Sequence, residues 1–222
     1  MKTNASSPFL DLRLGDCMDL MRDTPDDYYD LALVDPPYGI ARFQQTRNSK
    51  QRGVGSYCSS GEATDWDVKP DAEYFRELFR VSANQIIWGA NNFTLPPSEY
   101  FCIWNKHQTV ANFASAEYAW VSMGLKMPAK VFSYSIAQHN SDKGKIHPTQ
   151  KPVALYKWLL SNYAKPGQRI LDTHMGSGSI AIACHYFGAH LTATEIDEDY
   201  YQAAIERIEN ETAQGDFLTP MS

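Results

Sequence analysis

The four residues Asp35, Pro36, Pro37 and Tyr38 follow a short apolar run in the stretch LALVDPPYGI. Proline has no N–H group and a fixed backbone, so the carbonyls near Asp35 and Pro36 are rigid and can accept hydrogen bonds from a ligand. Asp35 adds an ionised acceptor, and Tyr38 adds a flat aromatic face. Two acceptors beside a ring fit a planar amine that donates two hydrogens, such as the exocyclic amine of a nucleobase.

Such an amine is a poor nucleophile because its lone pair is delocalised into the ring. Accepting both hydrogens at Asp35 and at the Pro36 carbonyl favours the pyramidal form, in which the lone pair points outward. The base has to leave the duplex to reach these groups, and stacking on Tyr38 offsets part of the unstacking cost. The remaining barrier falls through alignment with an electrophile and through electrostatics. The simpler alternative is a Pro-Pro turn that only ends a strand.

A second motif lies in RILDTHMGSGSIAIACHYFGAHLTATEID, which we interpret as strand, glycine turn, helix, strand and acid. The glycines let backbone N–H groups approach a ligand at the helix N-terminus. Glu195 ends the second strand, where a carboxylate can accept both hydroxyl hydrogens of a ribose. The turn is G-S-G, without G-x-G-x-x-G or G-K-[ST], which favours a nucleoside without a pyrophosphate. Asp172 suits a cationic group such as an α-ammonium.

The elements that position these motifs alternate between short apolar runs and helical patterns, which predicts a mostly parallel sheet with helices on both faces. We expect one domain over residues 1–222. The expected strands are 10–14, 31–34, 85–88, 100–104, 117–122, 169–171 and 190–194, and the expected helices are 17–22, 72–81, 152–164, 179–187 and 197–212.

The net charge of −6 argues against an indiscriminate coat for nucleic acid, but basic residues gather in segments 41–52 and 126–151. Either segment could equally be a solvated loop. The four cysteines form no C-x-x-C pair and are expected to be reduced thiols in a cytoplasmic protein, without a metal site. No apolar stretch approaches the length of a membrane span.

Together these motifs resemble the DNA amino-methyltransferases of the permuted beta group, which use S-adenosyl-L-methionine, and are most similar to small phage-type adenine-N6 enzymes. Residues 35–38 resemble the catalytic motif, His147–Pro152 the segment before the cofactor loop, and Asp172–Gly178 that loop. The catalytic motif precedes the cofactor loop, as in the beta group. The family commonly has D-P-F where this chain has Asp172, Thr173 and His174, so an imidazole could pack where a phenyl ring usually does.

The resemblance implies roles for further residues. Asp16 would accept from the N6 amine of the cofactor's adenine, Glu195 would hold the ribose, and Lys151 would pair with the methionine carboxylate. Asp35 could also touch the methionine ammonium, and Asp172 and the backbone of Gly176 to Gly178 would line the methionine end. The other cofactor-binding residues expected from the resemblance are Cys17, Thr149, Thr173, Gly176, Ser177 and Gly178.

The resemblance also implies an α/β fold of the Rossmann-like class I methyltransferase type. Its seven-stranded, mostly parallel sheet would have a circularly permuted order, with 117–122 as the one antiparallel strand. The chain lacks room for a large recognition domain, so loops 40–65 and 126–147 are expected to face double-stranded DNA. The residues expected to contact DNA are Arg42, Arg47, Lys50, Arg52, Lys130, Lys143 and Lys145. A homodimer and a cognate restriction endonuclease are further partners that the family allows.

Several alternatives stay open at this point. Cytosine N4 exposes an amine to the same acceptors, although a first-position Asp is commoner in adenine enzymes of the family and Ser in cytosine-N4 enzymes. Cytosine C5 chemistry needs a nucleophilic thiol, typically after a proline, and no cysteine here follows a proline. Methylation of glutamine or of an RNA amine usually accompanies N-P-P-Y. A non-catalytic nucleic-acid-binding module with the same fold is the alternative from a different class.

Overall fold

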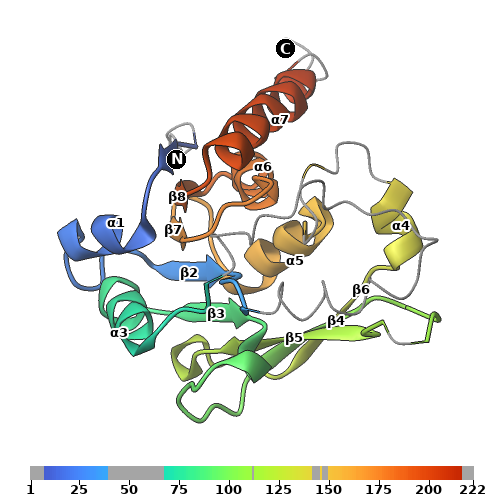
Figure 1. Cartoon of the computed structure of the whole chain (residues 1–222), viewed down its shortest axis with the longest axis horizontal. Coiled ribbons are helices and arrows are strands. Elements are labelled where there is room, and N and C mark those ends of the chain that lie inside the picture. The colour runs from blue at the N-terminus through green and yellow to red at the C-terminus, as the bar shows by residue number, and fades with distance from the viewer. Residues whose placement is uncertain (1–7, 40–67, 112, 142–145, 147–149, 217–222) are drawn as a thin grey trace, which may run out of the picture.

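A single eight-stranded sheet forms the centre of the computed structural model, with strand order β1-β8-β7-β2-β3-β5-β4-β6 (Figure 1). The structure describes all residues except 1–7, 40–67, 112, 142–145, 147–149 and 217–222. The strands are β1 (Leu10–Leu14), β2 (Leu31–Val34), β3 (Gln85–Trp88), β4 (Phe101–Asn105), β5 (Ala116–Val121), β6 (Lys130–Ser133), β7 (Arg169–Asp172) and β8 (His190–Glu195).

Helices cover both faces of this sheet. Figure 1 shows α1 and α3 on one side of the strands and α5 and α6 on the other. The described helices are α1 (Cys17–Asp23), α3 (Ala72–Val81), α4 (Ile136–Ser141), α5 (Val153–Tyr163), α6 (Ser179–Phe187) and α7 (Glu198–Asp216), with short 3-10 turns η1 (Ala90–Asn92) and η2 (Met123–Leu125). Among the residues that the structure describes, no helix has the length and apolar character to cross a membrane.

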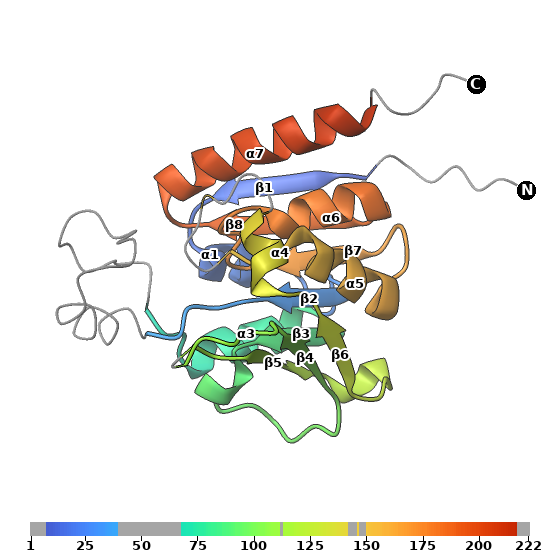
Figure 2. The ribbon, with the colours of Figure 1, turned by 90° about the vertical axis from the view of Figure 1, so that its right-hand side faces the viewer.

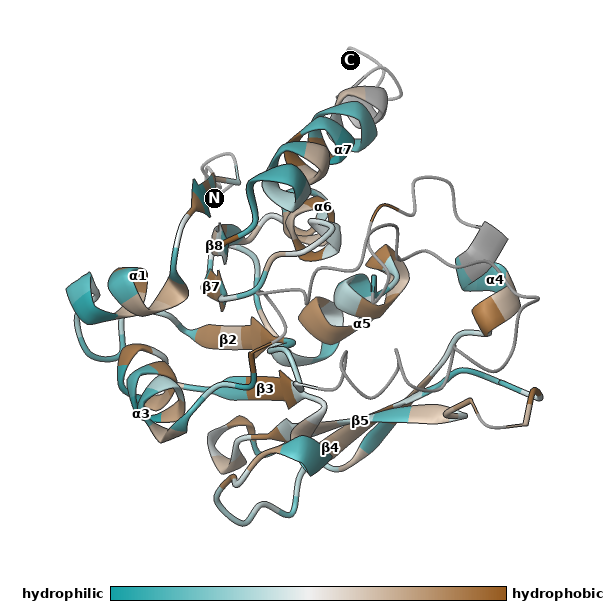
Figure 3. Ribbon diagram, viewed as in Figure 1, coloured by the Kyte–Doolittle hydropathy of each residue, from teal (hydrophilic) through white to brown (hydrophobic). Residues whose placement is uncertain are grey.

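Two apolar cores follow from the alternation of side chains along the central strands. On β2, Leu31 and Leu33 belong to the core under α5 and α6, whereas Ala32 and Val34 belong to the core under α1 and α3. All four are buried, which explains why this parallel strand is a continuous apolar run and not an alternating one. Figure 3 shows the apolar character of these central strands, since β2 and β3 are largely brown, whereas helix α7 is mostly teal.

Local signals in the sequence account for the helix positions. Asp71 caps α3 by accepting hydrogen bonds from the Glu73 and Tyr74 backbone N–H groups, at 2.9 and 3.0 Å. The buried residues of α3 recur at helical spacing and form one stripe against the sheet. They are Tyr74, Phe75, Leu78 and Val81.

The predicted fold class is confirmed. β5 pairs antiparallel with both β3 and β4, and every other ladder of the described sheet is parallel.

The strand count needs a correction, because β6 adds an eighth strand beside β4. The expectation of a loop over 126–147 was wrong for the same reason, since that segment contains β6 and α4. β6 is a four-residue edge strand in which Phe132 packs on the core and Val131 is exposed, so its apolar pattern is short.

Candidate active site

Four carboxylates meet where four neighbouring parallel strands end. Glu195 and Asp172 are the last residues of β8 and β7, Asp35 directly follows β2, and Asp16 follows β1 after one glycine. These strands lie side by side in the order β1-β8-β7-β2. In Figure 2, β1 and β2 run toward the same side of the molecule. The carboxyl edge of an open α/β sheet is where such folds bind their ligands.

The glycine turn between β7 and α6 is fixed by the acid of β8 and by α7. The Gly176 N–H donates to Glu195 Oε2 at 2.8 Å, and the Asp197 N–H donates to Glu195 Oε1 at 3.1 Å. From α7, Arg207 Nη1 donates to the Ser177 carbonyl at 2.7 Å. Gly178 has a φ of +71°, and a Cβ at this position would lie 2.7 Å from Ile208 Cδ1. The turn therefore requires glycine and is held rigid.

Asp172 is a buried carboxyl in an environment that disfavours its charge. Burial raises its pKa to about 7, against the effect of a 3.1 Å hydrogen bond that Oδ1 accepts from the His174 N–H. The charges of Asp35 and Glu195 contribute to this raised pKa, and the charge of Lys151 opposes it. A carboxyl that is partly protonated at neutral pH next to other acids is suited to receive a cationic ligand group.

Asp35 and Tyr38 contact each other directly. The Tyr38 hydroxyl donates to Asp35 Oδ1 at 2.6 Å, and the pKa of this phenol is raised, chiefly by burial. The ring lies over the turn after β3, where Gly89 has a φ of +64° and a Cβ would overlap the ring. Phe93 contacts the ring from the side, with centroids 6.0 Å apart. The sequence analysis missed Gly89, because nothing in W-G-A-N indicates which side chain crosses the glycine.

Lys151 is held by two carboxylates. Its ammonium forms an ion pair with Asp35 Oδ2 and lies 3.2 Å from Oε2 of Glu117 on β5. Lys106, just after β4, pairs with the other oxygen of Glu117. Burial would lower the pKa of Lys151, but the charges of Asp35 and Glu117 raise it well above its ordinary value. The resemblance implied that Lys151 pairs with the methionine carboxylate, and the sequence analysis predicted neither its contact with Asp35 nor the part of Lys106 and Glu117.

His174 is the residue at which the resemblance to the family would lead us to expect phenylalanine. Thr173 Oγ1 lies 2.6 Å from the Tyr74 hydroxyl and 2.9 Å from His174 Nδ1, so the three side chains form one hydrogen-bonded chain. Tyr74 and His174 also contact each other through their rings, whose centroids are 5.7 Å apart. Burial lowers the pKa of His174 to about 4, although the charge of Asp16 opposes this shift. The imidazole is therefore neutral at physiological pH and a weak base, and it packs as an aromatic ring against Tyr74.

Comparison with known proteins decides the family. Residues 84–206, more than half of the chain, match the DNA methylase family of N6 and N4 enzymes. The chain is a member of the DNA methylase family. The resemblance inferred from the sequence motifs is thus confirmed. The matched residues include Lys151, the glycine turn and Glu195, and they begin after the Asp35–Tyr38 motif.

Individual relatives agree with this assignment. The methylase is 26% identical to the type II methyltransferase M.HinfI of Haemophilus influenzae, an alignment covering 94% of this chain and 70% of the relative. It is 22% identical to the type II methyltransferase M.BglII of Bacillus subtilis, with 89% and 68% covered.

Among solved structures, the complex of M1.HpyAVI with S-adenosyl-L-methionine is similar at a TM-score of 0.57 and 18% identity, with 90% of this chain and 99% of that one covered. The cytosine-N4-specific PvuII DNA methyltransferase is similar at 0.58 and 10% identity, with 94% and 93% covered.

The remaining predicted cofactor residues of the methylase have structural positions of their own. Asp16 is the N-cap of α1 and accepts a 2.8 Å hydrogen bond from the Met18 N–H. Cys17 is buried, and burial together with Asp16 raises its pKa to about 12, so it is a neutral thiol. Thr173 and Ser177 are also buried at the carboxyl edge of the sheet.

Most residues predicted to contact DNA lie outside the described part of the methylase. Lys130 is described, and it begins the edge strand β6 instead of lying in a loop. It pairs in register with Cys102, near the start of β4, and so lies back from the carboxyl edge. The residues outside the described ranges are Arg42, Arg47, Lys50, Arg52, Lys143, Lys145 and the cofactor candidate Thr149.

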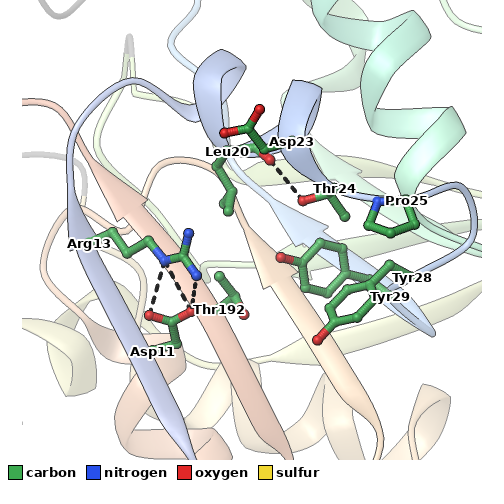
Figure 4. Close-up of a pocket in the computed structure, with 9 residues that line it drawn as sticks. All are labelled: Asp11, Arg13, Leu20, Asp23, Thr24, Pro25, Tyr28, Tyr29 and Thr192. Atoms are coloured by element: carbon green, nitrogen blue, oxygen red, sulfur yellow. Dashed lines mark hydrogen bonds and ion pairs between the residues drawn. The ribbon is translucent and has the colours of Figure 1, made fainter.

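A separate hollow lies between β1, β8 and the end of α1 (Figure 4). Its lining includes the ion pair of Arg13 with Asp11, at 2.6 Å, and the two rings of Tyr28 and Tyr29. None of the four strand-end carboxylates lines it. Throughout the described residues, no group of three or more His, Cys, Asp or Glu side chains is arranged to hold a metal ion.

Proposed function

We propose that the methylase transfers a methyl group from S-adenosyl-L-methionine to the exocyclic N6 amine of an adenine that has left the DNA duplex. The observation that carries this proposal is the placement of Asp35 and Tyr38 at the end of β2, beside the carboxylates of Asp172 and Glu195. This arrangement supports the proposal, because an amine acceptor and an aromatic platform would then lie next to a site for a cationic nucleoside.

The residues of the carboxyl edge fit such a methyl donor. The Glu195 carboxylate ends β8, where it can accept from ribose hydroxyls, and Asp16 lies at the end of the adjacent strand to accept from an adenine amine. Asp172 has a raised pKa that an ammonium group would lower again. Lys151 donates one N–H to Asp35, and an ammonium group has further N–H groups that could bind a ligand carboxylate. The bound donor would supply an electrophilic methyl carbon on its sulfonium.

The target base would be held by the Asp35–Tyr38 motif. The amine would donate to Asp35 Oδ and to the Pro36 carbonyl, and its ring would stack on Tyr38. The amine lone pair would then bond to the methyl carbon that the donor supplies, and the donor sulfur would keep the electron pair of the broken carbon–sulfur bond. The extra proton on the methylated amine leaves to Asp35 or to water. The neutral His174 and the thiol of Cys17 take no covalent part.

Cytosine N4 is the second candidate for the target amine. The likeness to the PvuII enzyme supports a shared fold, and both amines fit the same acceptors. We favour adenine because the motif begins with Asp35, which resembles the adenine enzymes of the family. The choice depends on the pocket for the flipped base and is decided by analysis of the product.

The test is methyl transfer from tritiated S-adenosyl-L-methionine to DNA of mixed sequence, followed by mass analysis of the labelled nucleoside. We expect N6-methyladenine from the unaltered chain, and a loss of roughly 10²–10⁴-fold in rate for Asp35→Ala. Labelled N4-methylcytosine would replace adenine by cytosine as the target. DNA binding without any label from the unaltered chain would contradict the proposal and favour a non-catalytic binding module.

A further inference from the structure

Four charged side chains form an alternating chain across the sheet, from Lys106 through Glu117 and Lys151 to Asp35. Lys106 follows β4, Glu117 is on β5, and Asp35 follows β2. The exposed fractions of the side chains are 16, 27, 4 and 18% in that order, so water screens these charges only partly. The proposed function uses Asp35 and Lys151 and leaves Glu117 and Lys106 without a role.

Glu117 and Asp35 share one positive charge. The Lys151 ammonium contacts an oxygen of each, and it lies 5.6 Å from the centroid of the Trp88 ring, which fixes its position from β3. Burial would raise the pKa of Glu117, but the charges of Lys151 and Lys106 lower it to about 2. Glu117 is therefore ionised at neutral pH and competes with Asp35 for the Lys151 ammonium, although the closer contact of Lys151 is with Asp35.

We propose that Glu117 is a positioning residue for methyl transfer. By attracting the Lys151 ammonium, Glu117 weakens the ion pair of Lys151 with Asp35, and the Asp35 carboxylate stays available to accept from the target amine. Both oxygens of Asp35 already accept a hydrogen bond, one from Tyr38 and one from Lys151. A stronger bond to Lys151 would make this carboxylate a poorer acceptor for an incoming N–H. Lys106 in turn limits how strongly Glu117 draws on Lys151.

This inference rests on the proposed function. It predicts opposite effects of two variants on ligand binding, with a loss of catalysis in only one of them. Glu117→Gln removes a negative charge beside Lys151, so a ligand carboxylate should bind Lys151 more tightly while Asp35 becomes less available. Lys106→Met leaves Glu117 with only Lys151, so the ligand carboxylate should bind less tightly while Asp35 stays available. A purely structural role would weaken both properties in both variants.

The experiment measures kcat at saturating substrates and, by calorimetry, the dissociation constant of S-adenosyl-L-homocysteine. For Glu117→Gln we expect kcat to fall roughly tenfold and the ligand to bind about threefold more tightly. For Lys106→Met we expect binding to weaken about threefold with kcat retained. Methylthioadenosine, which lacks the carboxylate and the ammonium, should bind all three proteins equally. Glu77→Gln, at the Arg80 ion pair of α3, is the matched control and should change neither quantity.

Two results would overturn the inference. One is a loss of both kcat and ligand affinity in Glu117→Gln, and the other is an unchanged kcat in that variant. Either is distinguishable from failure of the proposed function, because then the unaltered chain itself would show no methyl transfer. The calorimetric comparison of the two ligands also tests the chain of charges in the absence of catalysis.

Discussion

Individual residues at the carboxyl edge are arranged for binding at a cost in stability. Asp172 is buried beside two other carboxylates, and its pKa of about 7 lies well above the ordinary value of an aspartate. The folded protein therefore holds a proton at Asp172 more strongly than the unfolded chain does. As pH rises from about 4 to above 7, ionisation of this group should progressively destabilise the unliganded fold.

Asp172→Asn is accordingly expected to stabilise the unliganded protein at pH 8 by roughly 1–3 kcal/mol, with the gain shrinking toward pH 5. The same variant should bind S-adenosyl-L-methionine more weakly, because the ammonium loses its carboxylate. Denaturant unfolding at both pH values and calorimetry measure the two effects. Asp19→Asn, at an exposed position on α1, is the control and should change neither. A loss of stability at pH 8 in Asp172→Asn would contradict this account.

At the residue scale, the sequence identifies side chains that end strands or belong to motifs. Asp35, Asp172 and Glu195 could be predicted because each follows or ends a recognisable strand, whereas Asp16 was implied only by the resemblance to the family. Glu117 could not, because its partners Lys106 and Lys151 come from the end of β4 and the segment before α5. Such contacts depend on how strands are ordered in the sheet, and a single sequence states that order only through resemblance.

At the scale of elements, the turn between β3 and η1 makes room for the ring of Tyr38. Gly89 adopts a left-handed conformation there and has no Cβ to meet the ring. The strand β3 thus positions a side chain that follows its neighbour β2 in the sheet. The same scale shows what the sequence does not reveal, since β6 and α4 are too short and too mixed in polarity to give a clear periodic pattern.

Gly89→Ala should separate this role from the backbone cost of replacing a left-handed glycine. The backbone cost is about 1–2 kcal/mol at any such position. At Gly89 the new methyl group would also displace Tyr38 from Asp35, so we expect methyl transfer to fall at least about tenfold in a folded protein. Gly167→Ala is the matched control, because Gly167 has a φ of +83° and nothing within 4 Å of its Cβ position. Equal activities of the two variants would contradict the role of Gly89.

At the scale of the whole molecule, an acidic protein has to bind an acidic polymer. The net charge of −6 opposes association with DNA, so local clusters of basic residues must supply the attraction. Segment 41–52 has Arg42, Arg47, Lys50 and Arg52 and no acid, and along the chain it comes soon after the Asp35–Tyr38 motif that we propose to be catalytic. We therefore expect this segment to contact DNA phosphates next to the flipped base.

Reversing the charges of Arg47 and Arg52 to glutamate should weaken binding of duplex DNA and reduce its dependence on salt. Each lost phosphate contact lowers the slope of log K against log salt concentration by about 0.9. The measurement is a binding titration at several salt concentrations. The same reversal at Arg22 and Arg76, which are exposed on α1 and α3, controls for net charge. An unchanged slope for Arg47 and Arg52 would show that this segment does not contact the DNA backbone.

The eight strands of the described sheet all come from outside residues 40–67, and that segment joins β2 to α3. Gly39 and Val68, which flank it, belong to the described structure. A chimera that exchanges 40–67 for the corresponding segment of a relative would therefore leave every strand pairing and all four strand-end acids in place. Since we expect this segment to contact DNA, we also expect target preference to follow the exchanged segment, while the strand-end acids proposed for methyl transfer are kept.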